Sequence, residues 1–285
     1  VECNEPGPRE VLIKTSAAGV CHSDLHFING SYPHALPVVL GHESAGIVEA
    51  VGSAVTYVKP GDHVITCLSA FCGHCEHCLT GRMSLCNEPE LQRGVDEPSR
   101  LVKGDEGVAQ FLNLSSFAEY MLVHEHAIAK IREDMPLDRA ALIGCGVTTG
   151  VGAVIHTANI EPGSTVAVIG CGGVGLSAIN GAAIAGASRI IAIDMLDSKL
   201  ELARKFGATD IINAKSDDPV QAVRDLTGGG VHYSFEAIGL ASTAQQSFKM
   251  LNFGGTATII GMIPVGTMVE LHGPEFMMER KMQGS

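Results

Sequence analysis

The chain has 285 residues, 46% of them hydrophobic, and its 31 acidic residues outnumber 19 basic ones to give a formal net charge of −12. This composition supports sizeable cores and excludes global disorder, and the length allows one large domain or two ordinary ones. The negative charge disfavours binding to nucleic acid or to anionic membranes, so we expect a small-molecule partner.

The first half of the chain, to about residue 146, consists of short runs typical of β-strands, separated by glycine and proline turns. The clearest predicted strands are residues 10–16, 44–51 and 63–68. This spacing predicts a small barrel or sandwich. The polar stretch 87–106 has little periodicity, and we expect it to be a surface loop.

Four of the nine cysteines crowd together as C-x2-C-x2-C-x7-C, namely Cys72, Cys75, Cys78 and Cys86. Such short spacings let thiolates from one loop converge tetrahedrally on Zn²⁺. A [4Fe-4S] cluster is the alternative, but in the ferredoxin run the fourth cysteine follows after three residues and precedes a proline, whereas Asn87 follows Cys86 here. Four thiolates leave no open position, so the predicted zinc is structural. Clustered, odd-numbered cysteines also favour a reducing, cytoplasmic compartment over a secreted disulfide framework.

From residue 165 onward, apolar strands alternate with helices, which predicts an α/β fold with a parallel sheet covered on both faces. The predicted strands are 165–169, 189–194, 210–213, 231–237 and 256–261, and the predicted helices are 174–187, 198–206, 219–227 and 243–251. A complete doubly wound dinucleotide fold has six strands, so we expect this sheet to be unfinished.

Two stretches, 140–160 and 165–188, carry no charge and are long enough to cross a bilayer. The second contains six glycines and changes its periodicity partway, which favours a buried strand, turn and helix. We therefore expect a soluble protein without a membrane partner.

A glycine-rich turn follows the predicted strand 165–169 and opens the next helix, with the sequence Gly170-Cys171-Gly172-Gly173-Val174-Gly175. Its glycines permit a tight turn and let backbone N–H groups approach a pyrophosphate at the helix N-terminus. Asp194 closes the second strand 19 positions later, where a carboxylate can bind an adenosine ribose. This carboxylate favours NAD over NADP, and Lys199 could contact the same ribose.

Three further short motifs contain cysteines and histidines, and two cysteines with one histidine are a ligand set of catalytic zinc with one open position. They are Cys21-His22-Ser23-Asp24-Leu25-His26, Gly41-His42-Glu43 and Gly144-Cys145-Gly146. Their spacing alone does not unite them.

Taken together, these motifs resemble the zinc-containing medium-chain alcohol dehydrogenases of the medium-chain dehydrogenase/reductase superfamily. The specific pieces are the four-cysteine lobe, the glycine-rich turn with Asp194, Gly41-His42-Glu43-x2-Gly46-x5-Gly52, and Gly144-Cys145-Gly146-Val147-Thr148-Thr149-Gly150.

The resemblance implies a GroES-like, β-rich catalytic domain at residues 1–146 with the zinc lobe at 72–86. It also implies a Rossmann domain at residues 147–285 with an incomplete last strand, and a substrate cleft between the two. Further implications are two zinc ions per subunit, NAD, and a homodimer whose edge strands pair at residues 267–271. By comparison with the family, the chain is expected to be truncated at both ends.

The resemblance also assigns roles to individual residues. Cys21, His42 and Cys145 are the implied catalytic zinc ligands, Asp24 orients His42, and Glu43 can swing toward the metal. Ser23 and His26 occupy the proton-relay positions. Coenzyme contacts are assigned to His22, Thr149, Val174, Ile260 and Met262, and the substrate pocket includes Leu68, Phe111 and Leu114.

The expected function is therefore NAD-dependent oxidation of a primary, aromatic or similar alcohol to its aldehyde or ketone, with the reverse reaction also possible. One alternative is a thiol-dependent formaldehyde dehydrogenase acting on S-hydroxymethyl-glutathione, against which His26 counts. Another is a non-catalytic, truncated family member.

Overall fold

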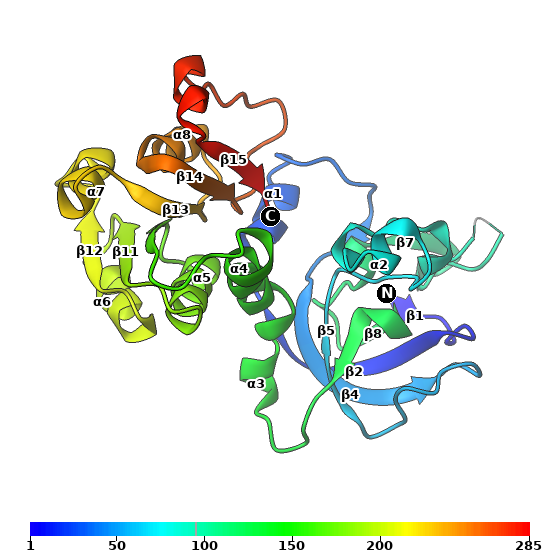
Figure 1. Ribbon diagram of the computed structural model, residues 1–285. Helices are drawn as coiled ribbons and strands as arrows, with labels where there is room; N and C mark the ends of the chain where they lie inside the picture. The colour runs from blue at the N-terminus through cyan, green and yellow to red at the C-terminus, as the bar shows by residue number, and fades with distance from the viewer. Residues whose placement is uncertain (95) are drawn as a thin grey trace. The chain divides into compact units, whose positions relative to one another are not determined.

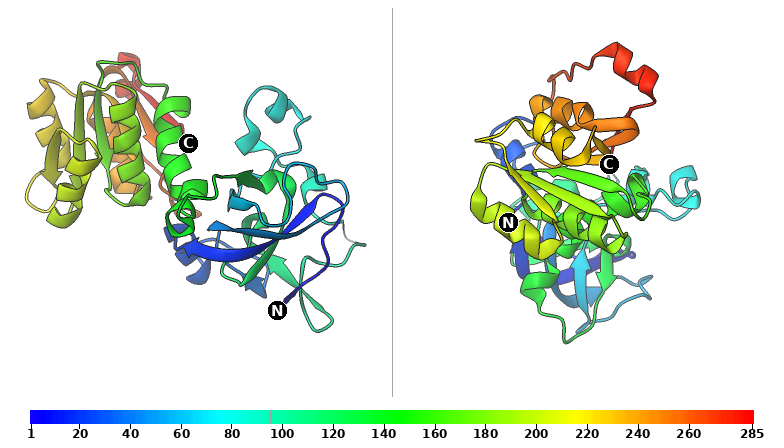
Figure 2. Two further views of the ribbon diagram at one scale, coloured as in Figure 1. Left: turned by 90° about the horizontal axis from the view of Figure 1, so that it is seen from below. Right: turned by 60° about the vertical axis from the view of Figure 1, so that its left-hand side comes forward.

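The computed structural model describes residues 1–94 and 96–285. The chain divides into two compact units, Val1–Cys145 and Gly146–Ser285. The course of each can be followed by colour in Figure 2, from blue to green in the first unit and from green to red in the second. Each unit encloses hydrophobic cores of its own.

The first unit is built from two sheets in the described part of the chain, which confirms the β-rich prediction (Figure 1). One has the strand order β8-β2-β4-β5-β9 and the other β1-β6-β7-β3. The strands are β1 (Glu2–Cys3), β2 (Glu10–Gly19), β3 (Val38–Val39), β4 (Glu43–Val51), β5 (His63–Thr66), β6 (Leu101–Lys103), β7 (Glu106–Gln110), β8 (Tyr120–His124) and β9 (Ile128–Lys130). The helices are α1 (His22–Ile28), α2 (Glu76–Leu79) and α3 (Leu137–Ala140).

The alternation of more and less buried side chains along β2 explains how this unit forms its core. Val11 and Ile13 are 0% exposed and pack with Val48 of β4, whereas the intervening positions are less buried. β2 continues past the predicted residue 16 to Gly19, which pairs with Glu43 at the start of β4. This longer pairing brings the segment after β2 beside the segment before β4, where two predicted zinc ligands lie.

The stretch 87–106, described except for residue 95, is mostly an exposed loop, as its polarity predicts, but it ends in a packed strand. It contains β6, which pairs with β1 and β7, and Arg100, which is 7% exposed. Arg100 Nε donates to Glu10 Oε1 at 2.7 Å, and Arg93 Nη2 donates to Glu10 Oε2 at 2.6 Å. Buried ion pairs, which periodicity does not reveal, fix this stretch to β2.

The second unit contains a parallel sheet in the order β12-β11-β10-β13-β14-β15 among the described residues. Helices α5 and α6 contact one face and α7 and α8 the other, which confirms the Rossmann-type prediction (Figure 1). The strands are β10 (Thr165–Ile169), β11 (Arg189–Asp194), β12 (Asp210–Asn213), β13 (Val231–Glu236), β14 (Leu251–Ile259) and β15 (Lys281–Gly284). The helices are α4 (Thr148–Gly152), α5 (Gly173–Ile184), α6 (Asp197–Phe206), α7 (Pro219–Thr227) and α8 (Ala241–Lys249).

Most boundaries in this unit lie within two residues of the predicted ones, and the larger differences are the following. α5 ends at Ile184 rather than 187, because Gly186 adopts a left-handed conformation with φ of 81°. β14 begins at Leu251 rather than 256, directly after α8. The sixth strand, β15, is present and pairs in parallel with β14, whereas residues 267–271 belong to no strand.

A helical run at Leu137–Thr157 joins α3 to α4 through a π-helical turn at Ile143–Val147. By length and composition it could cross a membrane, with a mean hydropathy of 1.5 over its most apolar window, 39% of which is buried. Core helices of globular proteins pass the same test. Ala140 and Val154 of this run are each 0% exposed and belong to the cores of the first and second units respectively.

Candidate metal and coenzyme sites

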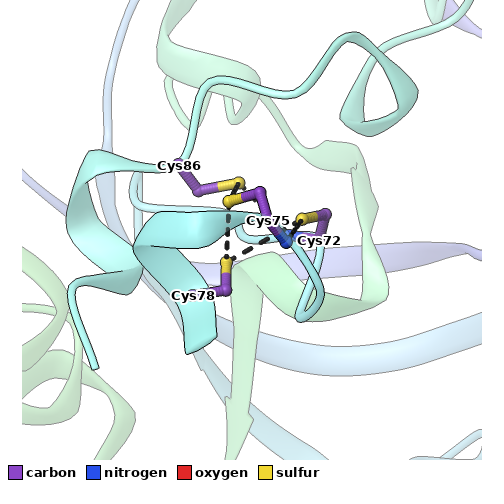
Figure 3. Close-up of side chains that lie close together, drawn as sticks. All are labelled: Cys72, Cys75, Cys78 and Cys86. Carbon is purple, nitrogen blue, oxygen red and sulfur yellow. Dashed lines mark hydrogen bonds between the residues drawn. The ribbon is translucent and has the colours of Figure 1, made fainter. Parts of the chain in front are cut away.

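The four clustered cysteines form a compact sulfur tetrahedron (Figure 3). Cys72 and Cys78 have their Sγ atoms 3.8 Å apart, Cys75 and Cys78 3.5 Å apart, and Cys75 and Cys86 3.9 Å apart. A zinc–sulfur bond of about 2.3 Å gives tetrahedral sulfur–sulfur edges of about 3.8 Å. The cage therefore fits one zinc ion and is too small to enclose a four-iron cluster.

Short local structure builds this lobe. Cys75 is the N-cap of α2, Cys78 lies within α2, and Cys86 follows a 3₁₀ turn at Met83–Leu85. The backbone N–H groups of His74 and Cys75 point at the Sγ of Cys72, at 3.4 and 3.3 Å. N–H donors of this kind stabilise thiolates, and a backbone hydrogen bond from Glu88 contributes most to lowering the pKa of Cys86 to about 7.

The three dispersed motifs also come together in the fold, which their spacing in the sequence could not predict. The ligand atoms of Cys21, His42, Glu43 and Cys145 all lie within 4.8 Å of one another. Cys21 is the N-cap of α1, His42 and Glu43 are at the start of β4, and Cys145 lies in the π-helical turn. Two thiolates, an imidazole and a carboxylate are a donor set that suits zinc.

Asp24 organises this second cluster from behind. Its Oδ1 accepts hydrogen bonds from His42 Nδ1 and from the Gly41 N–H, both at 3.1 Å, and its Oδ2 accepts one from the Cys21 N–H at 3.1 Å. His42 therefore carries its proton on Nδ1, which leaves the Nε2 lone pair for a metal. Asp24 is 2% exposed and His42 1% exposed, so the orientation is fixed by packing as well.

The pKa shifts within the cluster are those of a site that suits a cation. A hydrogen bond from Cys145, aided by His42 and Ser23, outweighs burial and lowers the pKa of Cys21 to about 3, whereas the same contact raises the pKa of Cys145. Burial alone would lower the pKa of His42, but Cys21 and Asp24 outweigh it and raise this pKa. Without a cation, one thiol of the pair therefore keeps its proton.

Glu43 is 6% exposed, and burial raises the pKa of its carboxyl group. A side chain at Gly19, the residue paired with Glu43, would overlap Glu43 Oε2. A Cβ at Gly144 would overlap the carbonyl oxygen of Thr66. These two glycines are needed for close packing around the cluster. Gly144 belongs to the motif that contains Cys145, whereas no motif indicated Gly19.

The relay residues lie on or beside α1. Ser23 Oγ is 3.5 Å from Cys21 Sγ. His26 is 8% exposed, its ring is edge-on to that of His22 with centroids 4.9 Å apart, and its Nδ1 has no hydrogen-bond partner among the described residues. Burial, followed by repulsion from His22, lowers the pKa of His26, so its imidazole is neutral near pH 7 and able to accept a proton.

The glycine-rich turn has the shape of a phosphate-binding loop. Gly170 has φ of 95°, and a Cβ at Gly175 would overlap its carbonyl oxygen. At Gly172 and Gly173, by contrast, a Cβ would meet no heavy atom within 4 Å. Gly172 caps α5 without a side-chain hydrogen bond, so the first N–H groups of this 12-residue helix are open to an anion.

Asp194 closes β11 beside this loop. Its Oδ2 accepts a hydrogen bond from the Cys171 N–H at 2.8 Å, and its Oδ1 accepts one from the Leu196 N–H at 3.0 Å. Lys199 Nζ lies 3.9 Å from Asp194 Oδ2 and is partly exposed. The predicted ribose ligands are thus placed together, with the carboxylate held by the backbone.

Of the other predicted coenzyme residues, His22 is the first residue of α1 in the first unit, and the remaining four belong to the second unit. Thr149 and Val174 are both partly buried, and a Cβ at Gly150, next to Thr149, would overlap the Val174 carbonyl oxygen. Ile260 and Met262 follow β14 and are also partly buried.

The three residues predicted to line the substrate pocket differ in how deeply they are buried. Phe111 and Leu114 are both 0% exposed, and Leu114 belongs to the core of the first unit, so neither forms an open pocket wall in this structure. Leu68 is partly buried against the same core. The Phe111 ring packs edge-on against His42, with centroids 5.7 Å apart. Instead of lining a pocket, it therefore helps to hold the imidazole of this predicted zinc ligand in place.

Comparisons with known proteins agree with both halves of the chain. The family model for the alcohol dehydrogenase GroES-like domain matches residues 7–133, and the model for zinc-binding dehydrogenases matches residues 173–285. The chain is 44% identical over 275 residues to the class-3 alcohol dehydrogenase of Pisum sativum, covering 93% of this chain and 73% of that protein. It is 43% identical over 277 residues to a probable S-(hydroxymethyl)glutathione dehydrogenase 1 of Schizosaccharomyces pombe, covering 95% and 73%.

A solved structure resembles this chain along its whole length. The crystal structure of benzyl alcohol dehydrogenase from Acinetobacter calcoaceticus aligns with a TM-score of 0.90 at 36% identity, covering 100% of this chain and 78% of that one. With two family models, close relatives and both metal-binding clusters in agreement, the chain belongs to the zinc-containing medium-chain alcohol dehydrogenases, a family of zinc- and nicotinamide-dependent oxidoreductases.

Proposed function

We propose that this protein oxidises a primary or aromatic alcohol to the aldehyde, with Cys21, His42 and Cys145 holding the catalytic zinc and the four-cysteine lobe holding a structural one. The observation that carries the proposal is the convergence of the dispersed ligands within 4.8 Å, with Asp24 behind His42. Bound zinc would supply Lewis acidity that lowers the pKa of an alcohol oxygen toward neutrality.

This chain's own residues then handle the proton and the orientation. Ser23, beside Cys21, is the first proton acceptor, and the neutral imidazole of His26 is the exit of the relay. Asp24 holds the tautomer of His42, and Glu43 stays close enough to compete for the metal when no substrate is present. Bound NAD would supply the hydride acceptor.

We propose NAD rather than NADP as the coenzyme. Gly172 and Gly173 leave space for a pyrophosphate at the N-terminus of α5, and His22, Thr149, Val174, Ile260 and Met262 would contact the rest of the molecule. The backbone N–H groups of Cys171 and Leu196 hold the Asp194 carboxylate. This carboxylate would accept hydrogen bonds from the ribose hydroxyls and repel a 2′-phosphate, although the positive charge of Lys199 lies nearby. The ratio of kcat/KM for NAD to that for NADP should exceed about ten, the factor set by 1.4 kcal/mol.

The test is NADH formation by the zinc-loaded protein with benzyl alcohol, ethanol and a long-chain alcohol. We expect two zinc ions per chain and a signal with at least one of these alcohols. Absence of NADH formation with all three in a sample that contains both zinc ions would refute the proposal.

A second candidate substrate is S-(hydroxymethyl)glutathione, which is favoured by the 43% identity to a relative named for that activity. Formaldehyde with and without glutathione separates the two candidates. NADH formation that requires both compounds and exceeds the benzyl alcohol rate would replace the alcohol proposal, whereas glutathione-independent turnover of benzyl alcohol would support it.

We also propose a cytoplasmic homodimer without nucleic-acid or membrane partners. None of the nine cysteines forms a disulfide, which is compatible with a reducing compartment, and the net charge is −12. Met268, within residues 267–271, is 79% exposed and nearby Val265 is 66% exposed, and both supply apolar surface for a second copy. Light scattering after size-exclusion chromatography should give twice the chain mass, and a monomer would refute the dimer.

A further inference from the structure

Glu236 is a buried carboxylate that the proposed reaction does not use. It is the last residue of β13 and is 0% exposed, the lowest exposure among the charged side chains that the structure describes. Its Oε2 has no hydrogen-bond partner among the described residues. A polar group is costly to bury without a complete set of partners, so a carboxylate at this position calls for an explanation.

The other carboxylate oxygen ties down the turn that follows β13. Oε1 of Glu236 accepts hydrogen bonds from the Ile238 N–H at 3.0 Å, the Gly239 N–H at 2.8 Å and the Thr243 hydroxyl at 2.7 Å. One atom thus fixes both the turn and the first helical residues of α8.

Glu236 also meets the segment that leaves β14. Its backbone carbonyl accepts hydrogen bonds from the Ile260 N–H at 2.8 Å and the Gly261 N–H at 3.0 Å. A Cβ at Gly261 would lie 2.6 Å from Glu236 Oε2, and one at Gly239 would crowd the Met262 backbone. The side chain therefore fills the space between two loops that leave adjacent strands.

These loops lie on one side of the phosphate-binding turn. In the sheet, β11 with Asp194 flanks β10 on one side and β13 flanks it on the other. A dinucleotide crosses the carboxyl ends of such a sheet at this switch point, so its two halves lie over opposite sides. With the adenosine half at Asp194, the nicotinamide half belongs over β13 and β14.

We propose that Glu236 is a positioning residue for the nicotinamide half of the coenzyme. It holds the turn at 238–239 and the segment 260–262 in their binding shape without itself touching the coenzyme. The inference rests on the proposed use of NAD.

The test compares NADH with AMP, a probe of the adenosine half alone, by calorimetric titration of the full chain. We expect Glu236→Gln to raise the Kd of NADH about tenfold, which corresponds to 1.4 kcal/mol, and to change that of AMP by less than about twofold. Thr243→Val keeps the buried carboxylate but removes one donor to Oε1, and it should raise the Kd of NADH about threefold. This milder variant preserves the test if the glutamine variant does not fold.

Ser234→Ala is the matched control. Ser234 lies on the same strand at 0% exposure, and its hydroxyl donates to the Ser247 carbonyl of α8 at 2.8 Å, away from the coenzyme edge. It should lower the melting temperature and leave the Kd of NADH within twofold. Unchanged NADH binding in the folded Glu236 and Thr243 variants would overturn the proposal, as would equal weakening of NADH and AMP. If the unaltered chain binds no NADH, the proposed function itself fails.

Discussion

The two cysteine clusters that we propose as zinc sites are built in opposite ways. The lobe takes Cys72, Cys75, Cys78 and Cys86 from a single loop and a four-residue helix. The other cluster takes Cys21, His42 and Cys145 from three distant parts of the first unit, brought together by the pairing of β2 with β4 and by the helical run that follows α3. The first depends on local sequence, and the second on the whole fold.

The difference in donors implies a difference in chemistry. Four thiolates around Zn²⁺ give a net charge of −2 and a closed coordination shell, which suits a structural role. Two thiolates and a neutral imidazole leave the ion with no net charge and an open position, so it remains a Lewis acid. We propose that Asp24 and Glu43, the two buried carboxylates at the second cluster, adjust that acidity.

The largest expected effect is loss of catalysis without loss of the fold. Cys145→Ala removes a thiolate from the dispersed cluster, and we expect kcat/KM to fall by at least about 10³ because the zinc supplies several kcal/mol of transition-state stabilisation. The variant should keep one zinc per chain and a melting temperature within a few degrees, as measured by metal analysis and calorimetry. A variant that retains a tenth of the activity would exclude Cys145 as a catalytic ligand.

Removing a cysteine from the lobe should instead lower the stability of the fold. Cys78→Ser opens the lobe, in which few side chains are deeply buried, so zinc supplies most of its folding free energy. We expect the melting temperature to fall on the order of 10 °C, with one zinc retained. Melting unchanged from that of the unaltered protein would mean that the lobe does not depend on its metal.

A third substitution, at Glu10, tests whether ion pairs hold the segment that follows the lobe. Burial alone would raise the pKa of Glu10, but Arg93 and Arg100 outweigh it and lower the pKa to about 2. Because the folded pKa is below the ordinary value of 4.5, this pair stabilises the fold above about pH 4.5 and loses its contribution as the pH falls toward 2.

Glu10→Gln should therefore reduce the free energy of unfolding at pH 7 by about 2 kcal/mol and flatten its decline in acid. Zinc content should stay at two and activity should be unchanged. Urea titrations between pH 3 and 7 measure this effect. If the variant and the unaltered protein show parallel pH dependence, the ion pairs contribute nothing.

Local features of the fold were readable from the sequence, and long-range ones were not. β10, β11, β12 and α7 begin and end where the apolar periodicity predicts. The extension of β2 to Gly19 and the strand β6 depend on pairing with distant residues, so no local pattern marked them. Arg100, which precedes β6, is buried through its bonds to Glu10, so its charge gave no sign of the packed strand that follows it.

The same division applies to the sites. The lobe follows from its cysteine spacing, and the phosphate-binding loop from its glycines after an apolar strand. The dispersed cluster needed the family resemblance, because Cys21 and Cys145 carry no shared local signal. Gly19, which makes room for Glu43, and Phe111, which packs on His42, serve through shape alone and could be found only in three dimensions.

The smallest expected effect comes from a residue that lies behind the ligands rather than among them. Asp24→Asn keeps an oxygen that can accept from His42 Nδ1 and the Gly41 N–H, but it removes the negative charge behind the imidazole and the acceptor for the Cys21 N–H. Substitution of such outer partners typically lowers metal affinity about 10- to 100-fold, and because the bond to His42 is kept we expect about tenfold. Zinc release to a chelator should become biphasic, with the phase from the dispersed cluster accelerated and the phase from the lobe unchanged.

Asp62→Asn is the matched control, because Asp62 is a carboxylate of the same unit, 5% exposed, that accepts from the Lys59 N–H and from Lys130 Nζ at 3.0 and 2.8 Å. It should leave both release phases unchanged. Since each chain carries both clusters, the lobe serves as an internal reference for protein concentration and unfolding. If Asp24→Asn accelerates both phases, the substitution acts through general destabilisation. If it accelerates neither, the Asp24–His42 contact does not tune the metal, and the contrast between a locally held and a fold-held zinc rests on the ligands alone.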